Sequence, residues 1–271
     1  MEGRKMRKML WKSALALLLA ALLVGASASA SLAEELAYNL FEKHSTPSAE
    51  RRQDITWWLY APQEIGEDTS MVVFLHGGGE MGNGALSLGL PASMAFGTLQ
   101  NVPAVVVVPQ IPYNTGAWLK VDDALELITA EVMERFGIKP ENTALCGFSM
   151  GAIGTLDIAN RHPGKYRRIL VAAGRVNDQV RAASFEGSEV WFFVGRRDYD
   201  IRSETIYSFQ RLLENAGVPA TVTVLETNHL GTEQAVFSDP EVMDWLFTGV
   251  RPSASVSLVP PFRFTGTSVL Q

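Results

Sequence analysis

Cysteine is almost absent from the sequence, which contains a single one, Cys146, among 271 residues. One cysteine cannot form an intramolecular disulfide bond, and no second thiol lies nearby to complete the spacing of a metal site. Stability must therefore come from packing, and 47% hydrophobic residues supply enough material for one core. The sequence predicts neither a bound metal nor a cofactor.

Basic residues are also few once the N-terminus is set aside. Residues 1–30 hold five of the 23 lysines and arginines and one of the 29 acidic residues, which leaves 18 against 28 and a formal charge of −10. Binding to nucleic acids or to anionic membrane surfaces depends on neutralising phosphates, so an acidic chain without a basic run is unsuited to either partner. Neutral or cationic substrates fit this charge better.

A hydrophobic run long enough to span a membrane is missing as well. The uninterrupted apolar block at 14–24 is about half of the roughly 20 residues that a spanning helix needs. Five basic residues precede this block and the small-residue segment GASASASLA follows it, an order typical of a secretory signal peptide. We therefore predict a signal peptide over residues 1–30 and a secreted or extracytoplasmic protein without stable membrane association. The alternative is an uncleaved N-terminal membrane anchor.

Short apolar runs alternate with helical periodicity along the rest of the chain. Five runs rich in valine and phenylalanine predict strands buried on both faces, at 71–79, 104–110, 143–149, 168–175 and 189–195. Helical patterns occur at 121–137, 150–162 and 203–217. This alternation predicts an α/β fold, a doubly wound and mostly parallel sheet whose ligands bind at the carboxyl ends of the strands.

The remaining segments complete one domain, which we place at residues 34–250. Residues 55–62 predict an earlier antiparallel edge strand, 220–227 a half-exposed strand and 239–249 a closing helix. Residues 251–271 are rich in proline and serine and predict a tail without periodic structure. The segment at 176–188 is too short for a large lid, so the site should be shallow and open.

Ser149 lies between two glycines in the segment Gly147-Phe148-Ser149-Met150-Gly151. This G-x-S-x-G pattern, with a predicted strand before it and a predicted helix after it, is typical of a nucleophile elbow. The glycines relieve crowding around a sharply turned serine. The alternative is an ordinary connection in which the serine caps the helix.

A nucleophilic serine needs a histidine as base and a carboxylate that holds the histidine. In this kind of site the three follow in the order serine, acid, histidine, and His229 is the one histidine of the four that has that place. Asp198 and Asp200 both follow the strand at 189–195. We favour Asp198 because it lies nearer the end of the strand; salt bridges with neighbouring arginines are the alternative role.

Acyl transfer also needs amide donors for the oxygen that becomes negative. One is expected from Met150, the residue after the nucleophile. The glycine-rich loop HGGGEMGNG at 76–84 follows an earlier strand, and we assign the second donor to the amide of Gly78, with Gly79 as the alternative. A flexible turn would explain the same glycines without chemistry.

Taken in order, these segments resemble the α/β-hydrolase family, in particular the secreted branch of feruloyl and acetyl-xylan esterases, polyhydroxybutyrate depolymerases and predicted peptidases. The resemblance covers roughly residues 50–248, through VVFLHGGGEMGNG, VVPQIPYNTGAWLKVDDAL, GFSMGAIGTLDIANRHPGKY, FFVGRRD, NHLGT and DWLF. It implies Ser149, Asp198 and His229 as catalytic residues, with the Gly78 and Met150 amides as oxyanion hole. It also implies that Trp118 lines the substrate pocket, for which core packing is the alternative. The family often has a histidine before the glycine that leads to the acid, and this chain has Val194 there. The resemblance therefore does not identify the substrate.

The function expected from these residues is that of an exported serine hydrolase. It would cleave small acyl or aryl esters, free or linked to polysaccharide, through an acyl-enzyme intermediate. A serine peptidase of the same fold and a non-catalytic binding protein that keeps the hydrolase scaffold are the alternatives. Matched ester and amide substrates separate the first two, and a fluorophosphonate probe separates the third.

Overall fold

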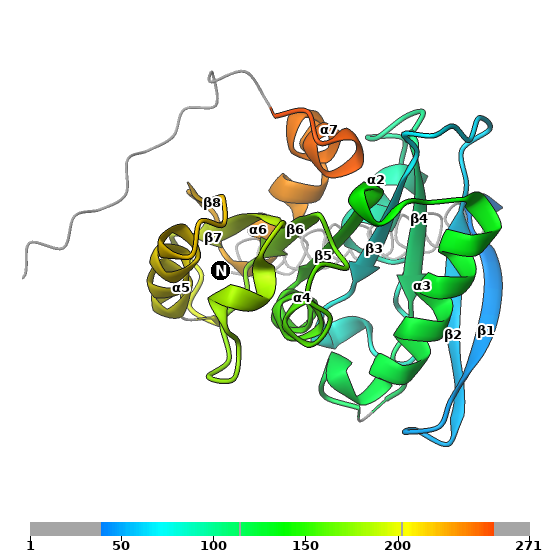
Figure 1. Ribbon diagram of the computed structural model, residues 1–271, viewed down its shortest axis with the longest axis horizontal. Coiled ribbons are helices and arrows are strands. Elements are labelled where there is room, and N and C mark those ends of the chain that lie inside the picture. The colour runs from blue at the N-terminus through cyan, green and yellow to red at the C-terminus, as the bar shows by residue number, and fades with distance from the viewer. Residues whose placement is uncertain (1–38, 114, 202, 252–271) are drawn as a thin grey trace, which may run out of the picture.

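A computed structural model describes residues 39–113, 115–201 and 203–251 of the chain. Over these residues the chain forms one eight-stranded sheet with helices on both faces (Figure 1). The predicted signal peptide and all but Arg251 of the predicted tail lie outside the described residues, so both stay predictions, as does the domain boundary at residue 34. No helix in the described part of the chain is long and apolar enough to cross a membrane.

The sheet has the strand order β1-β2-β4-β3-β5-β6-β7-β8. β1 and β2 pair antiparallel, β2 and β4 pair antiparallel, and all other neighbours are parallel. The strands are β1 (Glu42–Ser48), β2 (Gln53–Tyr60), β3 (Ser70–Leu75), β4 (Ala104–Pro109), β5 (Thr143–Phe148), β6 (Arg168–Ala172), β7 (Glu189–Gly195) and β8 (Ala220–Leu225). The mostly parallel, doubly wound fold predicted from the sequence is confirmed.

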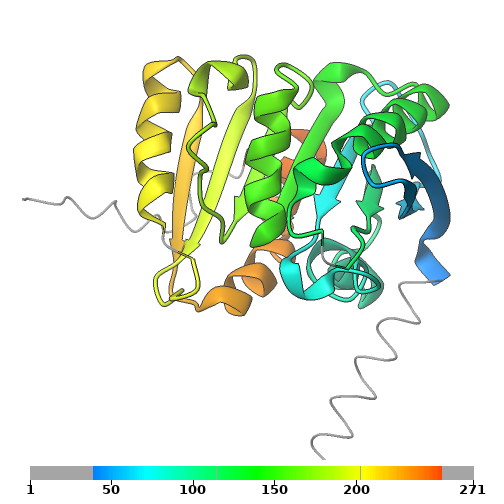
Figure 2. The same cartoon turned by 90° about the horizontal axis from the view of Figure 1, so that it is seen from below.

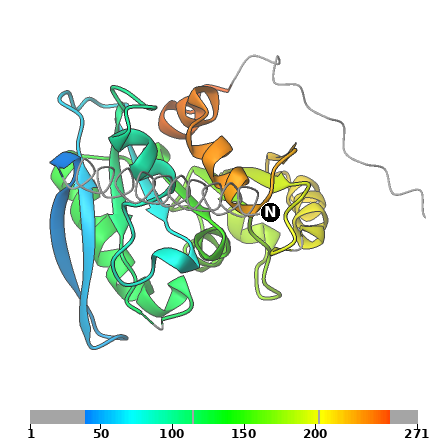
Figure 3. The same cartoon turned by 180° about the vertical axis from the view of Figure 1, so that it is seen from behind.

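The helices divide between the two faces of the sheet. Figure 2 shows α3, α4 and α5 on one face, and Figure 3 shows α6 and α7 packed on the other, where α2 also lies. They are α2 (Gly89–Ala95), α3 (Asp122–Phe136), α4 (Met150–Arg161), α5 (Glu204–Asn215), α6 (His229–Phe237) and α7 (Pro240–Thr248). The described residues also form four short 3-10 helices, η1 (Gly78–Glu80), η2 (Trp118–Val121), η3 (Pro140–Asn142) and η4 (Ala182–Phe185).

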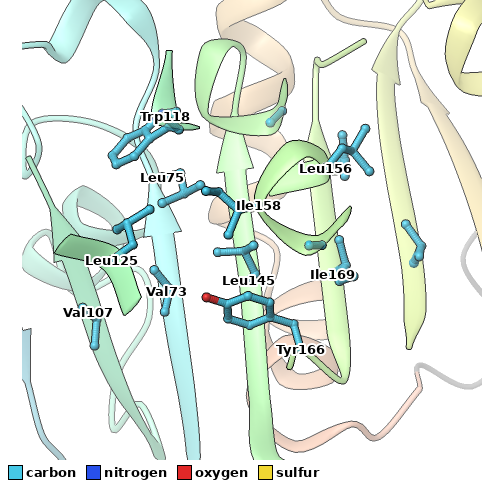
Figure 4. Close-up of a cluster of buried hydrophobic side chains, with 14 of the residues drawn as sticks. Val73, Leu75, Val107, Trp118, Leu125, Leu145, Leu156, Ile158, Tyr166 and Ile169 are labelled. Atoms are coloured by element: carbon cyan, nitrogen blue, oxygen red, sulfur yellow. The ribbon is translucent and has the colours of Figure 1, made fainter. Parts of the chain in front are cut away.

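The central strands are mostly apolar and include many β-branched residues, as expected for strands that are covered on both faces of the sheet. Every residue of β3, β4, β5 and β6 is buried. Side chains of one face pack with those of α3 and α4, as Figure 4 shows for Val73, Leu145 and Leu156 among others. This packing fixes the carboxyl ends of the central strands, from which the loops that carry the site emerge.

The antiparallel strand predicted at 55–62 is present, but it is not an edge strand. Residues 53–60 form β2, which lies inside the sheet between β1 and β4, and β1 is the edge strand on that side. The sequence of β1, EKHSTPS, lacks an apolar run because several of its side chains face solvent, so its hydrophobicity gives no strand signal. Helices α2 and α6 were not predicted either.

Candidate active site

Ser149 forms the sharp turn between β5 and α4. β5 ends at Phe148 and α4 begins at Met150, so this one residue joins the strand to the helix. Its backbone has φ 53° and ψ −115°, a conformation that costs a residue with a side chain roughly 1–3 kcal/mol. The Ser149 hydroxyl makes no capping hydrogen bond to α4, which speaks against the helix-cap alternative. The strained turn leaves this hydroxyl available to side chains from other loops.

The two glycines of the pattern are required by close approach of the backbone. A Cβ added to Gly151 would lie 2.7 Å from the carbonyl oxygen of His76 and closer still to that of Leu75. A Cβ added to Gly147 would lie 2.5 Å from the backbone of Gly151. The elbow therefore packs directly against the end of β3, and only glycine fits on either side of Ser149.

The Gly151→Ala variant tests this close packing. The added methyl group would overlap backbone atoms that cannot rotate away, so we expect a loss of about 3 kcal/mol in the free energy of unfolding. Thermal denaturation should show a midpoint lowered by about 6–12 °C. Gly66→Ala is the matched control, because nothing lies within 4 Å of a Cβ at Gly66 and its stability should change little. An unchanged midpoint for Gly151→Ala would contradict the described elbow.

His229 reaches Ser149 from the loop that follows β8. α6 begins at His229, and the side chain of Asn228 caps this helix by accepting a hydrogen bond from the Gly231 amide at 2.9 Å. The capped start fixes the histidine, and its Nε2 lies 2.8 Å from the Ser149 hydroxyl oxygen, although 80 residues separate the two in sequence. The ring also packs against Phe148, with the ring centres 4.7 Å apart.

Asp198 holds the other side of the imidazole ring. Its Oδ2 lies 2.7 Å from Nδ1 of His229, and its side chain is only 4% exposed. The second oxygen, Oδ1, accepts hydrogen bonds from the backbone amides of Asp200 and Ile201 at 3.0 and 3.1 Å. Because an ionised carboxylate only accepts, Nδ1 carries the proton and Nε2 is left to accept from the Ser149 hydroxyl. Of the two aspartates left open by the sequence, Asp198 makes the contact, while Asp200 is exposed and contributes its amide.

The two amides expected to bind an oxyanion lie at the starts of helices. Gly78 is the first residue of η1 and Met150 the first of α4, positions whose N–H groups have no partner within the helix. The glycine loop also lies against the elbow, because a Cβ on Gly77 would come 3.1 Å from the Phe148 ring. Both expected donors therefore belong to segments that pack on each other next to Ser149.

His76 orients the peptide group between Gly77 and Gly78, which contains the Gly78 N–H, and this role was not predicted from the sequence. Its Nδ1 donates to the Gly77 carbonyl at 2.7 Å and its Nε2 accepts from the Ile111 amide at 3.2 Å. Burial lowers the pKa of His76 to about 4, so the ring is neutral in this tautomer at neutral pH. In a trans peptide the N–H points opposite to the C=O. Holding the Gly77 carbonyl toward His76 thus directs the Gly78 N–H away from it.

Trp118 lies under this loop and not on a pocket wall. Its side chain is 1% exposed, its Nε1 donates to the His76 carbonyl at 3.2 Å, and the two rings meet edge to face with their centres 4.9 Å apart. A Cβ on Gly154 would lie 2.6 Å from the indole, so α4 closes over it. The expectation that Trp118 lines the substrate pocket is not met, and its packing alternative describes the structure.

Exposed apolar side chains surround the carboxyl edge of the sheet instead. Tyr113 is 64% exposed, Tyr199 92% and Leu230 62%, in the loops after β4 and β7 and at the start of α6. The ring of Tyr113 lies directly over Gly82 of the glycine loop, and its hydroxyl donates to Oδ1 of Asn83 at 3.0 Å. Apolar side chains are therefore exposed in three of the segments that follow the carboxyl ends of the strands.

Two groups of side chains in the described part of the chain place three ligand-type atoms within 4.8 Å of one another. They are Asp198, Asp200 and His229, and Asp122, Glu126 and His162. In the first group both ring nitrogens of the histidine already have partners. In the second, Arg161 and Lys165 pair with the carboxylates. These contacts explain both groups, and we assign a metal to neither.

A family model described as "Putative esterase" matches residues 48–216. The match includes Ser149 and Asp198 and ends before His229. A search of curated proteins gives no match.

Solved structures of esterases share the fold at low sequence identity. A thermostable esterase superposes with a TM-score of 0.66 at 20% identity, over 78% of this chain and 63% of its own. A ferulic acid esterase from Anaeromyces mucronatus, in complex with ferulic acid, gives 0.51 at 17% identity, over 73% and 90%. Esterase 2 of Thermogutta terrifontis, phosphorylated by paraoxon, gives 0.53 at 14% identity, over 70% and 84%. The chain therefore spans less than two thirds of the thermostable esterase, and these likenesses establish the fold.

Proposed function

The chain belongs to the Esterase family, within the α/β-hydrolases, and from this premise we propose that it is a serine hydrolase of carboxylic esters. The observation that carries the proposal is the continuous hydrogen-bond chain Ser149–His229–Asp198, with 2.8 Å and 2.7 Å between successive heavy atoms. A chain of this kind, on a strained elbow, is the arrangement that makes a serine hydroxyl nucleophilic.

The geometry supports a two-step reaction. As the Ser149 oxygen attacks the ester carbon, its proton passes to Nε2 of His229, and the Asp198 carboxylate stabilises the resulting imidazolium. The former carbonyl oxygen becomes negative and accepts hydrogen bonds from the Gly78 and Met150 amides. The imidazolium then protonates the departing alcohol, which leaves an acyl group on Ser149. Water, deprotonated by the same imidazole, hydrolyses this acyl-enzyme and restores the serine.

We base the proposed substrate class on the exposed side chains in the loops after the strands and on the short segment between β6 and β7. Tyr113 and Tyr199 are exposed in loops that follow the carboxyl ends of β4 and β7, which supports contacts with flat or aliphatic acyl groups, and the segment between β6 and β7 is too short for a large lid over the site. We propose small acyl or aryl esters, including esters on polysaccharides, as substrates. On the basis of the predicted signal peptide, we also propose that the enzyme is exported and acts on these substrates outside the cytoplasm.

A panel of chromogenic esters tests the proposal. We expect p-nitrophenyl acetate and butyrate to be hydrolysed with an initial burst of nitrophenol, equal to the enzyme concentration if deacylation is slower than acylation. Paraoxon should add one diethyl phosphate to the peptide that contains Ser149, detected by mass spectrometry. Matched anilides should react far more slowly, whereas faster anilide hydrolysis would favour a peptidase. No ester turnover and no labelling would favour a binding protein.

A further inference from the structure

Two glutamates beside the candidate site have no place in the mechanism described above. Glu80 ends η1 in the glycine loop, and Glu233 lies on α6, four residues after His229 and so on the same face of that helix. Glu233 is only 3% exposed, and its Oε1 is buried without a hydrogen-bond partner. That oxygen lies against Gly89, where an added Cβ would come 3.1 Å from it.

Glu80 is the centre of the hydrogen bonds that shape the glycine loop. Its carboxylate accepts from the backbone amide of Gly77 and from its own amide. Its main-chain carbonyl accepts from Nε2 of Gln110 at 2.8 Å and from the amide of Gly84 at 2.9 Å. His76 holds the carbonyl of Gly77 at the same time. Both polar groups of Gly77, the residue before the Gly78 donor, are therefore fixed by neighbouring side chains.

The two carboxyl groups influence each other's charge. Burial raises the pKa of Glu80 above its ordinary range, while the two amide hydrogen bonds oppose this rise by favouring the ionised form. Burial and, to a smaller extent, the negative charge of Glu80 together raise the pKa of Glu233 to about 8. Glu233 is thus the carboxyl that keeps a proton at neutral pH. The hydrogen bonds that Glu80 accepts favour its ionised form.

Few other charges of the described chain face Glu233. Helix α2, which packs on α6, contains no ionisable side chain. The ionisable groups on the other elements packed on α6 either lie at the amino ends of their strands, where they bind other residues, or are exposed. These are Arg168 of β6, bound to Ser70 and Leu246; Glu189 of β7, paired with Arg251; and the exposed Glu241 and Asp244 of α7. On α6 itself, His229 is engaged by Ser149 and Asp198.

We propose that Glu80 and Glu233 act as a pair that positions the oxyanion loop, Glu80 as the carboxylate that holds Gly77 and Glu233 as a carboxyl that must keep its proton. Loss of that proton would leave a second negative charge, buried and without a hydrogen-bond partner, within the electrostatic reach of Glu80 and of the loop that carries the Gly78 amide. The inference rests on the proposed function, since it concerns the loop that carries the Gly78 amide. Both are positioning residues, because neither touches the reacting atoms.

The pH dependence of ester hydrolysis tests the role of the Glu233 proton. Above about pH 8 the kcat of the wild-type enzyme should fall, approaching tenfold per pH unit as the protonated fraction falls, with KM little changed. The Glu233→Gln variant, which cannot ionise, should show no such fall between pH 8 and 9.5, whatever its absolute rate. A fall of the same shape in this variant would overturn the proposal, as would a wild-type profile that stays level.

The Glu80→Gln variant gives an independent shift. Removing the Glu80 charge removes one cause of the raised Glu233 pKa, so the alkaline fall should begin at a lower pH than in the wild type. Its kcat at neutral pH should also drop by about tenfold, because a neutral acceptor holds the Gly77 amide less strongly. Glu131→Gln, an exposed site on α3 across the sheet, is the control with the same loss of charge and should keep the wild-type profile. An unshifted profile in Glu80→Gln would contradict the pairing.

A stability measurement separates this inference from the proposed function. The folded pKa of Glu233, about 8, lies above the unfolded value near 4.5, so the wild type loses stability as pH rises between these values and no further above them. The difference in thermal midpoint, Glu233→Gln minus wild type, should therefore grow from pH 5 to 8 and then level off. A difference independent of pH would overturn the proposal even if ester hydrolysis is found. If no ester is hydrolysed, the proposed function fails and this measurement still decides whether Glu233 holds its proton.

Discussion

Replacement of Ser149 by alanine is expected to abolish ester hydrolysis and the nitrophenol burst, with kcat/KM lowered at least about 10⁴-fold. The Ser149 oxygen is the atom to which Nε2 of His229 is hydrogen-bonded at 2.8 Å, and no hydroxyl remains to attack once it is removed. Initial rates with p-nitrophenyl butyrate and paraoxon labelling measure the loss. Ser208→Ala, on the exposed side of α5, is the matched control and should keep the wild-type rate. Turnover above a few per cent in Ser149→Ala would remove this serine from the mechanism.

Ser149→Gly adds a test of the strained turn. Both Ser149→Ala and Ser149→Gly lose the hydroxyl, but glycine adopts φ 53°, ψ −115° without the steric cost that alanine retains. Part of that gain is offset because glycine has more conformational freedom in the unfolded chain. We therefore expect Ser149→Gly to be more stable than Ser149→Ala by about 1 kcal/mol, or about 2–4 °C in thermal midpoint, while both are inactive. Equal stability of the two would mean that the elbow is not strained.

The parts of the site that lie on short local patterns could be predicted from the sequence. Ser149 and its two glycines lie within five residues, and the strand and the helix directly adjoin them. One continuous segment of sequence is therefore enough to predict the elbow. Asp198 and His229 follow strands whose carboxyl ends meet at one edge of the sheet, and they occur in the order serine, acid, histidine that is typical of this kind of site. Their positions were therefore predictable before any distance between them was known.

Features that depend on contacts between distant segments left no such signal. The role of His76 depends on Gly77 and on the Ile111 amide 35 residues away, so its ring could not be told from a surface histidine. Glu233 sits beside Gln234 in a helix without a continuous apolar stripe, and a glutamate there is expected to face solvent. Its burial arises because α6 packs between α2 and β7. Trp118 was ambiguous for the converse reason, since an apolar side chain can line a pocket or fill the core.

Replacement of Asp198 by asparagine is the second change with a large expected effect. In the wild type Oδ1 accepts from two amides, those of Asp200 and Ile201. An asparagine must keep its oxygen on those two donors, which turns its NH₂ group toward Nδ1 of His229. Nδ1 then has to accept, the ring proton moves to Nε2, and the imidazole can no longer take the proton of Ser149. We expect kcat to fall about 10⁴-fold at neutral pH with an intact fold.

Asp200→Asn is the matched control for this prediction, because it removes the same charge two residues away. Asp200 is exposed and contributes its backbone amide to Asp198, which asparagine retains, so kcat should stay within about threefold of the wild type. Initial ester-hydrolysis rates and far-UV circular dichroism of both variants would be measured together. Equal losses in the two variants would assign the decline to charge near His229 in general. The two variants have the same net charge and, by circular dichroism, the same fold. A large loss in Asp198→Asn alone would therefore show that the Asp198 carboxylate sets the tautomer of the imidazole.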